Sequence, residues 1–413
     1  MKIVHVSTLD LGGGAARGAY WLHLALKQAG ADSRMFVATS NSGSPDVIES
    51  RRGRELCRLR EVLDEQALSA FPDRPPVYFS PATWSESAVA SEINDLNADI
   101  INLHWVAGGF LLPEELSALR GPVVWTLRDM WPFTGGCHYS EGCLRFEAAC
   151  GECPVLGSSQ PDDLTHQLWR RKKEAWKTQP GQLVGVSRWM AECARSSSLF
   201  RDRPVEVIPN GLCVKTFAPR DKLKARKTLG IPASARVILF GALFSTADRR
   251  KGFQYLKPAL ELLGGDGDKP ELVVFGATES DVVFENDLSI RYLGTIFDDE
   301  KLSELYSAAD VTVAPSTEDA CPKVPIESMA CGTPVVCFDA TGMRDIVEHK
   351  VTGYRARCYD PADLAAGIRW VLEEGRQSSL SSSARAAVLR EFATDLQAKR
   401  YLALYERLLA GGG

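Results

Sequence analysis

The segment from Ala314 to Phe338 holds the residues whose types and spacing point most directly to chemistry. Asp319 and Glu327, with seven residues between them, bracket a turn that leads into a short predicted helix at Val324–Cys331. A proline in the first turn and a glycine at the end support that helix. Its N-terminus attracts a phosphate, and carboxylates at such a turn are natural acceptors for sugar hydroxyls. The segment therefore predicts a site for a sugar that carries phosphate.

Two further stretches carry groups that suit a phosphate. Gly13 and Gly14 lie in a glycine-rich loop between the first predicted strand and a predicted helix at Arg17–Ala29. Glycines there let backbone amides approach a phosphate or a sugar. In the second half of the chain, Arg250 and Lys251 can neutralise phosphate charge, although a solvated loop is the simpler reading of this basic run.

In the first half, His104 and the pair Arg128-Asp129 directly follow two predicted strands, Asp99–Leu103 and Pro122–Leu127. Ligands of parallel sheets bind beyond the carboxyl ends of the strands, so these side chains are candidates for the reacting groups. His104 equally suits the simpler role of a hydrogen-bonded histidine at a strand end.

Four cysteines form a cluster within 17 residues, in the spacing C-x5-C-x6-C-x2-C, with His138 beside the first. They are Cys137, Cys143, Cys150 and Cys153. Four thiolates can close a tetrahedral structural zinc site, and the C-x2-C pair is a good zinc half-site. Disulfide or redox pairing and unligated cysteines remain open as alternatives. Cys321, Cys331 and Cys337 are expected to be small core residues.

Short apolar runs alternate with amphipathic stretches almost from end to end, which predicts parallel sheets covered by helices on both faces. Predicted strands are Ile3–Val6, Arg34–Ala38, Asp99–Leu103, Pro122–Leu127 and Leu183–Ser187, then Arg236–Gly241, Glu271–Gly276, Ile290–Gly294, Asp310–Ala314 and Pro334–Phe338. The series restarts near Val205–Asn210. We therefore expect an α/β fold of two doubly wound, Rossmann-like domains that face each other across a cleft, at residues 1–205 and 206–390.

Length and charge exclude several classes of function. The chain has 413 residues, a net charge of −5 and no biased tract, which agrees with two domains and argues against a nucleic-acid partner. No apolar run reaches the roughly 20 residues that span a bilayer, and no signal peptide is evident. We therefore expect a cytoplasmic protein whose 11 cysteines do not form a set of structural disulfides. The oligomeric state is not predicted.

These motifs, in this order, resemble the retaining GT4-like glycosyltransferases of GT-B fold. The signature of that family is an acid, seven residues and a glutamate, then a small-residue helix and a Gly-Thr-Pro-Val-Val strand, as at Asp319, Glu327 and 332–336 here. The first acid of the family is usually glutamate, so Asp319 departs from the pattern, and Glu318 is one residue out of register. The final segment, 391–413, resembles the family's crossover helix that returns to the first domain.

The resemblance implies that a nucleotide-diphospho-sugar, most commonly a UDP- or GDP-sugar, binds to the second domain. Asp319 would then contact the donor sugar and Glu327 the ribose, while Lys251 and Arg250 bind the diphosphate. The turn at Cys321, Pro322, Lys323 and Val324 would line the same site. The family's arginine after the strand ending at Gly241 is absent, since Ala242 stands there, and Arg249 or Arg250 can compensate.

The implied reaction transfers a hexosyl-type sugar to a hydroxyl acceptor with retention of anomeric configuration. The departing phosphate can take the acceptor proton, so neither a strong protein base nor a catalytic metal is expected. The family often has Thr-x-His-Asp where this chain has Thr126-Leu127-Arg128-Asp129, so Arg128 replaces the histidine. An arginine there could grip the donor phosphates or an anionic acceptor.

The cysteine-rich loop at residues 130–155 resembles that of family members associated with exopolysaccharide and colanic acid assembly. We therefore expect it to shape acceptor binding in the first domain, with zinc in a structural role. A lipid-linked acceptor would place the protein peripherally at the inner face of a membrane. Two alternatives stay open: a sugar-nucleotide-binding scaffold without transferase activity, and a sugar-nucleotide epimerase or hydrolase of the same fold.

Overall fold

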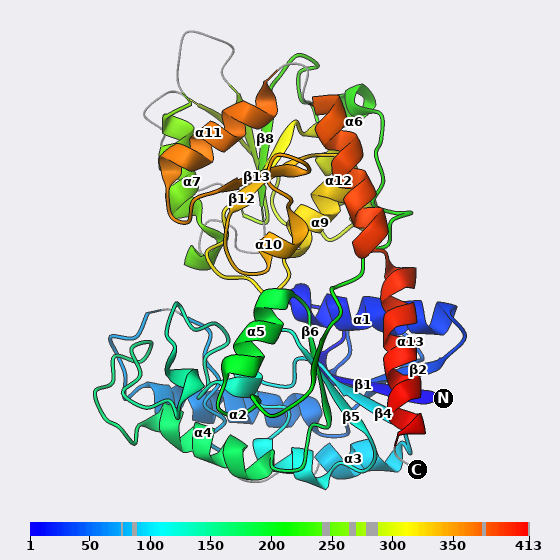
Figure 1. Cartoon of the computed structure of the whole chain (residues 1–413), viewed down its shortest axis with the longest axis vertical. Coiled ribbons are helices and arrows are strands. Elements are labelled where there is room, and N and C mark those ends of the chain that lie inside the picture. The colour runs from blue at the N-terminus through cyan, green and yellow to red at the C-terminus, as the bar shows by residue number, and fades with distance from the viewer. Residues whose placement is uncertain are drawn as a thin grey trace. The chain divides into compact units, whose positions relative to one another are not determined.

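The computed structural model describes residues 1–75, 77–84, 89–241, 248–263, 270–277, 288–373 and 377–411. The chain divides into two compact units, which Figure 1 shows as separate sheets with their own helices. Unit 1 comprises Met1–Asn210 and Asp395–Gly413, and unit 2 comprises Gly211–Thr394. The first unit thus extends to Asn210, whereas the sequence placed the boundary after residue 205, and it also takes the end of the chain.

Unit 1 is built on a seven-stranded parallel sheet in the order β3-β2-β1-β4-β5-β6-β7. Its strands are β1 (Lys2–Leu9), β2 (Asp32–Thr39), β3 (Val47–Glu49), β4 (Ile100–Leu103), β5 (Val123–Leu127), β6 (Gln182–Gly185) and β7 (Val205–Val207). The strand order reverses between β1 and β4. In a doubly wound sheet this reversal opens a crevice at the carboxyl ends of those two strands.

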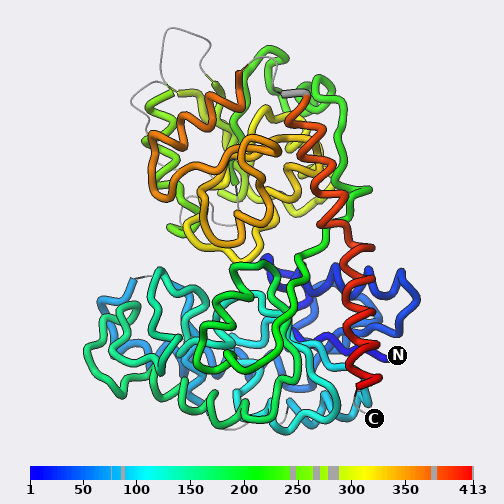
Figure 2. The backbone as a smooth tube through the Cα atoms, in the orientation of Figure 1, coloured from blue at the N-terminus to red at the C-terminus, as the bar shows by residue number. Residues whose placement is uncertain are grey.

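The helices of unit 1 are α1 (Gly13–Gln28), α2 (Gly53–Leu68), α3 (Val89–Asp95), α4 (Leu164–Ala175), α5 (Arg188–Ser196) and α13 (Thr394–Ala410), with 3₁₀ turns η1 (Pro113–Ala118), η2 (Trp131–Phe133) and η3 (Arg145–Glu147). One core cluster joins α1, the central strands and α13, so the first strand and the last helix lie in the same unit (Figure 2). The cluster contains Ile3, Leu22, Leu26, Ile100, Val124, Val184, Tyr401 and Leu404 among others.

Buried hydrogen bonds also fix α13 to this sheet. The Asn102 amide of β4 donates to the Tyr405 hydroxyl at 2.6 Å, and the Thr126 hydroxyl of β5 lies 2.9 Å from that of Tyr401. Burial raises the pKa of both tyrosines, so both phenols are neutral hydrogen-bonding groups at ordinary pH. The polar pairs therefore specify where the helix sits, beyond what its apolar face alone requires.

Unit 2 is built on a six-stranded parallel sheet in the order β10-β9-β8-β11-β12-β13. Its strands are β8 (Val237–Gly241), β9 (Glu271–Phe275), β10 (Ser289–Tyr292), β11 (Val311–Ala314), β12 (Val335–Phe338) and β13 (Gly353–Ala356). Its helices are α6 (Lys222–Thr228), α7 (Phe253–Glu261), α8 (Asp299–Ala308), α9 (Lys323–Ala330), α10 (Met343–Ile346), α11 (Pro361–Leu372) and α12 (Gln377–Glu391), with η4 at Arg249–Lys251. In Figure 1, α7 and α11 lie together, as do α9 and α12, and these pairs are in contact.

Aspartate begins several of these helices, as expected for a residue whose side chain accepts hydrogen bonds from first-turn amides. The helices α4, α6, α8 and α11 start in this way, at Asp163, Asp221, Asp298 and Asp360. Each cap satisfies amides that a helix leaves unpaired, so the local sequence sets where these helices begin.

The predicted fold class, two doubly wound α/β domains, is confirmed. The segment Val205–Val207, which the sequence assigned to the restart of the series, instead pairs with β6 as the last strand of the first sheet. The described helices include none that combines the length and apolar character needed to cross a bilayer.

Changing Tyr405 to Phe removes the acceptor of the Asn102 amide inside a buried site. We expect the free energy of unfolding of unit 1 to fall by about 1–3 kcal/mol, because a buried donor loses its partner. Urea denaturation followed by tryptophan fluorescence measures this. The control is Arg407→Ala, which removes an exposed ion pair between the same helix and Glu206 and should cost less than about 1 kcal/mol. Equal losses in the two variants would contradict the assigned role of the buried pair.

Candidate active site

In unit 2, the signature segment forms a loop and a helix at the carboxyl end of the sheet. The strand β11 ends at Ala314, residues 315–322 form the loop, and α9 begins at Lys323. Pro322 occupies the N-cap position with extended backbone angles, and its own side chain makes no capping hydrogen bond. The first-turn amides and the dipole of α9 favour an anion at this end of the helix.

The turn at residues 249–252 holds one side of this loop at very close range. The Thr317 amide donates to the Arg250 carbonyl at 2.8 Å. A Cβ atom at Gly252 would lie 1.9 Å from the Pro315 carbonyl oxygen, and Gly252 has φ +78°. Only glycine meets both conditions, so the crossing of the two segments depends on Gly252.

Gly342 holds the other side. Its amide donates to the Asp319 carbonyl at 3.0 Å, and a Cβ atom there would lie 2.1 Å from the Ala320 carbonyl oxygen. The Thr341 hydroxyl lies 3.3 Å from the Asp319 amide. Contacts from the turn at residues 249–252 and from residues 341–342 thus fix the position of the loop that carries Asp319.

The same crossing brings Lys251 and Asp319 into direct contact. The Lys251 ammonium donates to Asp319 Oδ2 at 2.8 Å, and their side chains are 20% and 13% exposed. The neighbouring Arg250 pairs instead with Asp248 at 2.7 Å, and Asp248 also accepts from the Arg250 amide. Two residues predicted for the donor site therefore meet, while Ala242 lies outside the described residues.

Glu327 is the fifth of the eight residues of α9 and is buried. The Tyr306 hydroxyl of α8 donates to Glu327 Oε2 at 2.8 Å, which orients the carboxylate. Sequence reasoning missed Tyr306, because inside a helix it carries no local signal that distinguishes it from a core residue. The turn residues Cys321 and Pro322 are buried, while Lys323 and Val324 are half-buried.

A polar network below α9 fixes its position on the sheet. The Ser328 hydroxyl contacts the Thr312 hydroxyl of β11 at 2.8 Å and the Thr333 carbonyl at 2.9 Å. The Thr333 hydroxyl donates to the Tyr306 carbonyl at 2.7 Å. Because these groups are buried and paired, the helix carrying Glu327 has one well-defined position. Cys321, Cys331 and Cys337 are buried beside it, as predicted for core residues.

In unit 1, the glycine-rich loop follows β1 and opens α1. Gly12 and Gly13 have φ +119° and +73°, and a Cβ atom at Gly13 or Gly14 would meet nothing within 4 Å. The buried Asp10 lies just before this loop, and its carboxylate accepts hydrogen bonds from the Asn41 amide at 2.8 Å and the Ser42 amide at 2.9 Å. These bonds join the end of β1 to the residues that follow β2. Gly13 and Gly14 are thus exposed first residues of α1, with open space at their α-carbons.

Arg128 and His104 meet in a buried chain of hydrogen bonds. The Arg128 guanidinium donates to His104 Nδ1 at 3.2–3.4 Å and to the Asn210 side chain. His104 Nδ1 is therefore the acceptor, and its Nε2–H faces His5 Nδ1 at 2.9 Å. Burial, and then the Arg128 charge and the neighbouring His5, hold the pKa of His104 well below its usual value. His104 is thus a neutral support for Arg128.

Asp129 pairs with a histidine that sequence reasoning did not assign to the site. His138 Nδ1 lies 2.6 Å from Asp129 Oδ2, and its Nε2 lies 2.9 Å from the Ser80 hydroxyl. The Trp131 amide donates to the other Asp129 oxygen at 3.0 Å. The only signal for His138 in the sequence was its place beside Cys137 in the cysteine cluster.

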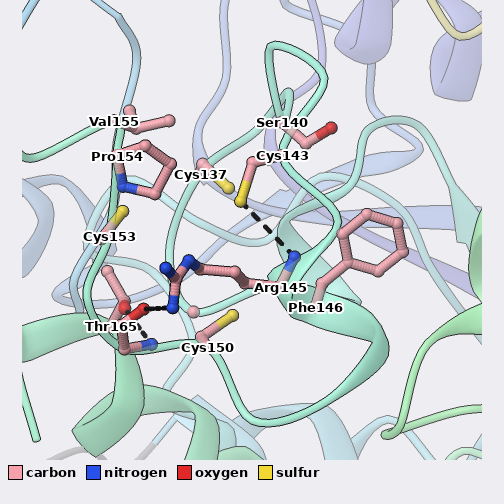
Figure 3. A pocket seen from close by; sticks show the side chains of 12 residues that line it. Cys137, Ser140, Cys143, Arg145, Phe146, Cys150, Cys153, Pro154, Val155 and Thr165 are labelled. Carbon is pink, nitrogen blue, oxygen red and sulfur yellow. Dashed lines mark hydrogen bonds between the residues drawn. The ribbon is translucent and has the colours of Figure 1, made fainter. Parts of the chain in front are cut away.

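The four clustered cysteines surround one small cavity of about 20 Å³ in unit 1, as Figure 3 shows. The Arg145 side chain lies among them and donates to the Gly151 carbonyl at 3.3 Å and to Glu152 at 2.8 Å. Burial raises the pKa of the Cys137 and Cys153 thiols, and that of Cys150 to about 12.

All of these cysteines are free thiols. Over the described residues, no three histidine, cysteine or acidic side chains already stand together in the arrangement of a metal site. The zinc site therefore stays a prediction. What the structure adds is that the four cysteines line a common space about large enough for a single water-sized occupant.

Two family descriptions match this chain, one on each side of its middle. Residues 12–215 match "Glycosyltransferase Family 4", and residues 235–374 match "Glycosyl transferases group 1". The matches together span most of the chain.

Individual relatives agree with these matches. A D-inositol 3-phosphate glycosyltransferase of Geodermatophilus obscurus is 27% identical over 416 residues, which covers 92% of this chain and 83% of the relative. WcaC of Escherichia coli K12, a glycosyl transferase assigned to colanic acid biosynthesis, is 28% identical over 236 residues, which covers 55% of this chain and 54% of WcaC. The structure of Anabaena HepE in complex with UDP-glucose shares the fold, with a TM-score of 0.64 and 17% identity over 98% of this chain and 99% of that one.

Changing Gly252 to Ala should displace the loop at residues 315–322, because the added Cβ atom cannot coexist with the Pro315 carbonyl. We expect a loss of about 1–3 kcal/mol in the stability of unit 2 and faster amide hydrogen exchange in that loop. Thermal denaturation and exchange mass spectrometry measure both.

The matched control is Gly14→Ala, whose Cβ atom meets nothing and whose φ is not positive, so its effect should stay within about 0.5 kcal/mol. Unchanged exchange at residues 315–322 in the Gly252 variant would rule out the assigned role of the crossing.

Proposed function

The chain belongs to the glycosyltransferases that combine a family 4 domain with a group 1 domain in the GT-B fold, and on that premise we propose how it handles its substrates. It is a retaining hexosyltransferase whose nucleotide-diphospho-sugar donor binds to unit 2. Its hydroxyl acceptor, a glycan, a lipid-linked sugar or a small molecule, binds to unit 1. The observation that carries the donor assignment is the contact between Lys251 and Asp319 beside the N-terminus of α9.

Each predicted donor residue has a role that its surroundings support. Lys251 neutralises the diphosphate, with Arg250 beside it, and the first turn of α9, with the turn at Cys321–Val324, receives phosphate oxygens. Asp319 accepts hydrogen bonds from hydroxyls of the donor sugar. Glu327, oriented by Tyr306, accepts hydrogen bonds from the ribose. In unit 1, the exposed Gly13 and Gly14, with open space at their α-carbons, suit the close approach of a phosphate or a sugar.

The transfer breaks the bond between the anomeric carbon and the diphosphate oxygen and forms a bond from that carbon to the acceptor oxygen. With retention, the acceptor hydroxyl approaches from the face that the diphosphate leaves, and the departing phosphate oxygen takes the hydroxyl proton. The main task of the protein is then to stabilise the negative charge that builds on the diphosphate, and Lys251 is placed for that task.

The donor base is uracil in the simplest form of the proposal, because HepE, which shares the fold, binds UDP-glucose. A GDP-sugar is the alternative that the donor test below separates from it. In unit 1, Arg128, supported by His104, and Asp129 act on the acceptor side. The relation to WcaC supports an acceptor in exopolysaccharide assembly. If that acceptor is linked to a lipid, the protein acts in the cytoplasm, peripherally at the inner face of a membrane.

The four clustered cysteines hold a structural zinc ion in this proposal. Burial raises the pKa of the Cys137 and Cys150 thiols and so disfavours isolated thiolates in this cavity. A bound dication stabilises the thiolates and lowers their pKa. Four thiolates outweigh the charge of zinc by two, and the Arg145 guanidinium, which lies among the cysteines and also pairs with Glu152, offsets part of that excess. Zinc would fix the loop that carries His138 and, through it, Asp129.

Donor binding tests the proposal directly. Isothermal titration with UDP-glucose, UDP-galactose, GDP-mannose and free UDP should give a measurable dissociation constant for one nucleotide class. Lys251→Met and Glu327→Ala should each raise that constant by about 10–100-fold, since each removes a charged hydrogen-bond partner worth about 1.5–3 kcal/mol.

The control is Lys257→Met, which removes an ammonium of α7 that pairs with Glu261 and should leave donor affinity unchanged. Wild-type affinity in the Glu327 variant would refute the ribose contact. The absence of binding to every nucleotide tested would refute the donor site as a whole.

Metal analysis tests the zinc assignment. Protein purified under reducing conditions without chelator should carry about one zinc per chain, since four thiolates complete one tetrahedral site. Cys150→Ser should lose it, and Cys213→Ser, an exposed cysteine of unit 2, should keep it. A zinc-free protein whose clustered thiols all react with a thiol reagent would contradict the assignment.

A further inference from the structure

Three ring side chains that the donor chemistry does not use lie together in unit 1. Tyr78 lies 4.6 Å from His138 and 5.9 Å from Trp105 between ring centroids, and Trp105 lies 5.6 Å from His138. They come from three separate segments: the chain between α2 and α3, the residues after β4, and the cysteine-rich loop. The fold of unit 1 brings these three rings together.

The rings differ in their exposure. Tyr78 is 55% exposed, Trp105 is half-buried, and His138 is 3% exposed. Two large aromatic side chains thus present surface to solvent over a buried imidazole. Aromatic rings with a polar tip suit a ligand that is apolar on one face and hydrogen-bonding at its rim.

Buried polar groups hold the arrangement from below. His138 Nδ1 lies 2.6 Å from Asp129 Oδ2 and 3.3 Å from Trp105 Nε1, and His138 Nε2 lies 2.9 Å from the Ser80 hydroxyl. The His138 carbonyl accepts from the Met130 amide at 2.9 Å. His138 is therefore a positioning residue that cannot shift without breaking these polar contacts, one of which holds Trp105.

Trp105 is fixed at the point where the strand order of the sheet reverses. It follows β4, and its carbonyl accepts from the Thr8 amide, at the end of β1, at 2.7 Å. Its ring abuts Gly108, where a Cβ atom would lie 3.0 Å from Trp105 Cη2. Ligands of doubly wound sheets bind at this reversal, so the rings lie where the fold itself favours a ligand.

The charge around Tyr78 is negative. Partial burial, and then the carboxylates of Glu61, Asp129 and Asp64, raise the pKa of the phenol to about 12. These carboxylates disfavour a phosphate or carboxylate ligand on this surface. A neutral ligand meets no such penalty.

We infer that Tyr78 and Trp105 form a stacking surface for a neutral pyranose of the acceptor, so the acceptor is a glycoside rather than a free phosphate ester. One face of a pyranose carries C–H groups that suit the electron-rich faces of the two rings, and its rim hydroxyls suit the hydroxyl of Tyr78, since the Trp105 Nε1–H is directed at His138. This inference deepens the proposed transferase function and rests on it.

Binding of simple glycosides tests the inference without knowledge of the natural acceptor. The probes are methyl and p-nitrophenyl glycosides of glucose, galactose and mannose, and glycerol 3-phosphate is the anionic comparison. Their binding is measured by ligand-observed NMR in the presence of UDP. At least one glycoside should bind, and glycerol 3-phosphate should not compete with it. Tyr78→Ala, which changes an exposed side chain, and Trp105→Phe should each weaken that binding by about three- to ten-fold.

In both variants the dissociation constant for UDP should stay within about two-fold of the wild-type value, because the stacking surface and the UDP site are not in contact in the proposal. Leu144→Ala, which truncates an exposed apolar side chain elsewhere in the cysteine-rich loop, should leave glycoside binding unchanged. His138→Gln should raise the KM for the glycoside acceptor and leave the donor KM near wild type, as expected of a residue that positions the acceptor side.

The inference is overturned if no glycoside binds the wild-type protein, or if Tyr78→Ala and Trp105→Phe bind glycosides as tightly as wild type does. Competition by glycerol 3-phosphate at this surface overturns the neutral substrate class. Failure of UDP and GDP to bind while glycosides still bind would instead count against the donor proposal, so the two failures are distinguishable.

Discussion

The donor site that we propose depends on the crossing of two loops in unit 2. At Gly252 the backbone approaches the Pro315 carbonyl so closely that no side chain fits. The hydrogen bond from the Thr317 amide to the Arg250 carbonyl holds the same crossing, and the Lys251 ammonium lies against Asp319 beside it. That carboxylate balances the lysine charge. In the proposal, a diphosphate would offer the same ammonium a second anion, so donor binding would redistribute a charge pair that the fold has already assembled.

Unit 1 holds Arg128 and Asp129 by different buried partners. Arg128 contacts His104 and Asn210, and His104 is kept neutral behind it. The imidazole beside Asp129 is that of His138 in the cysteine-rich loop. The rigidity of that loop therefore bears on the site through one hydrogen bond of 2.6 Å, whether or not the four cysteines hold a metal.

The sequence made the architecture and the signature predictable because both rest on local patterns. Alternating apolar and amphipathic stretches indicated the strands, and the spacing of Asp319 and Glu327 marked the loop and helix that the structure contains. Partners distant in sequence were not predictable. Tyr306 beside Glu327 and Ser80 beside His138 look like ordinary helix and loop residues until the fold brings them there. The boundary moved from residue 205 to Asn210 because the pairing of β7 with β6 is non-local.

The central claim is that the donor diphosphate lies at the N-terminus of α9, against Lys251. A crystal structure of the full chain with bound UDP measures this most directly. The account predicts phosphate oxygens within hydrogen-bonding distance of Lys251 Nζ and of first-turn amides of α9, with the ribose hydroxyls on Glu327. A diphosphate bound elsewhere, with the contact between Lys251 and Asp319 undisturbed and Glu327 away from the ribose, would contradict it.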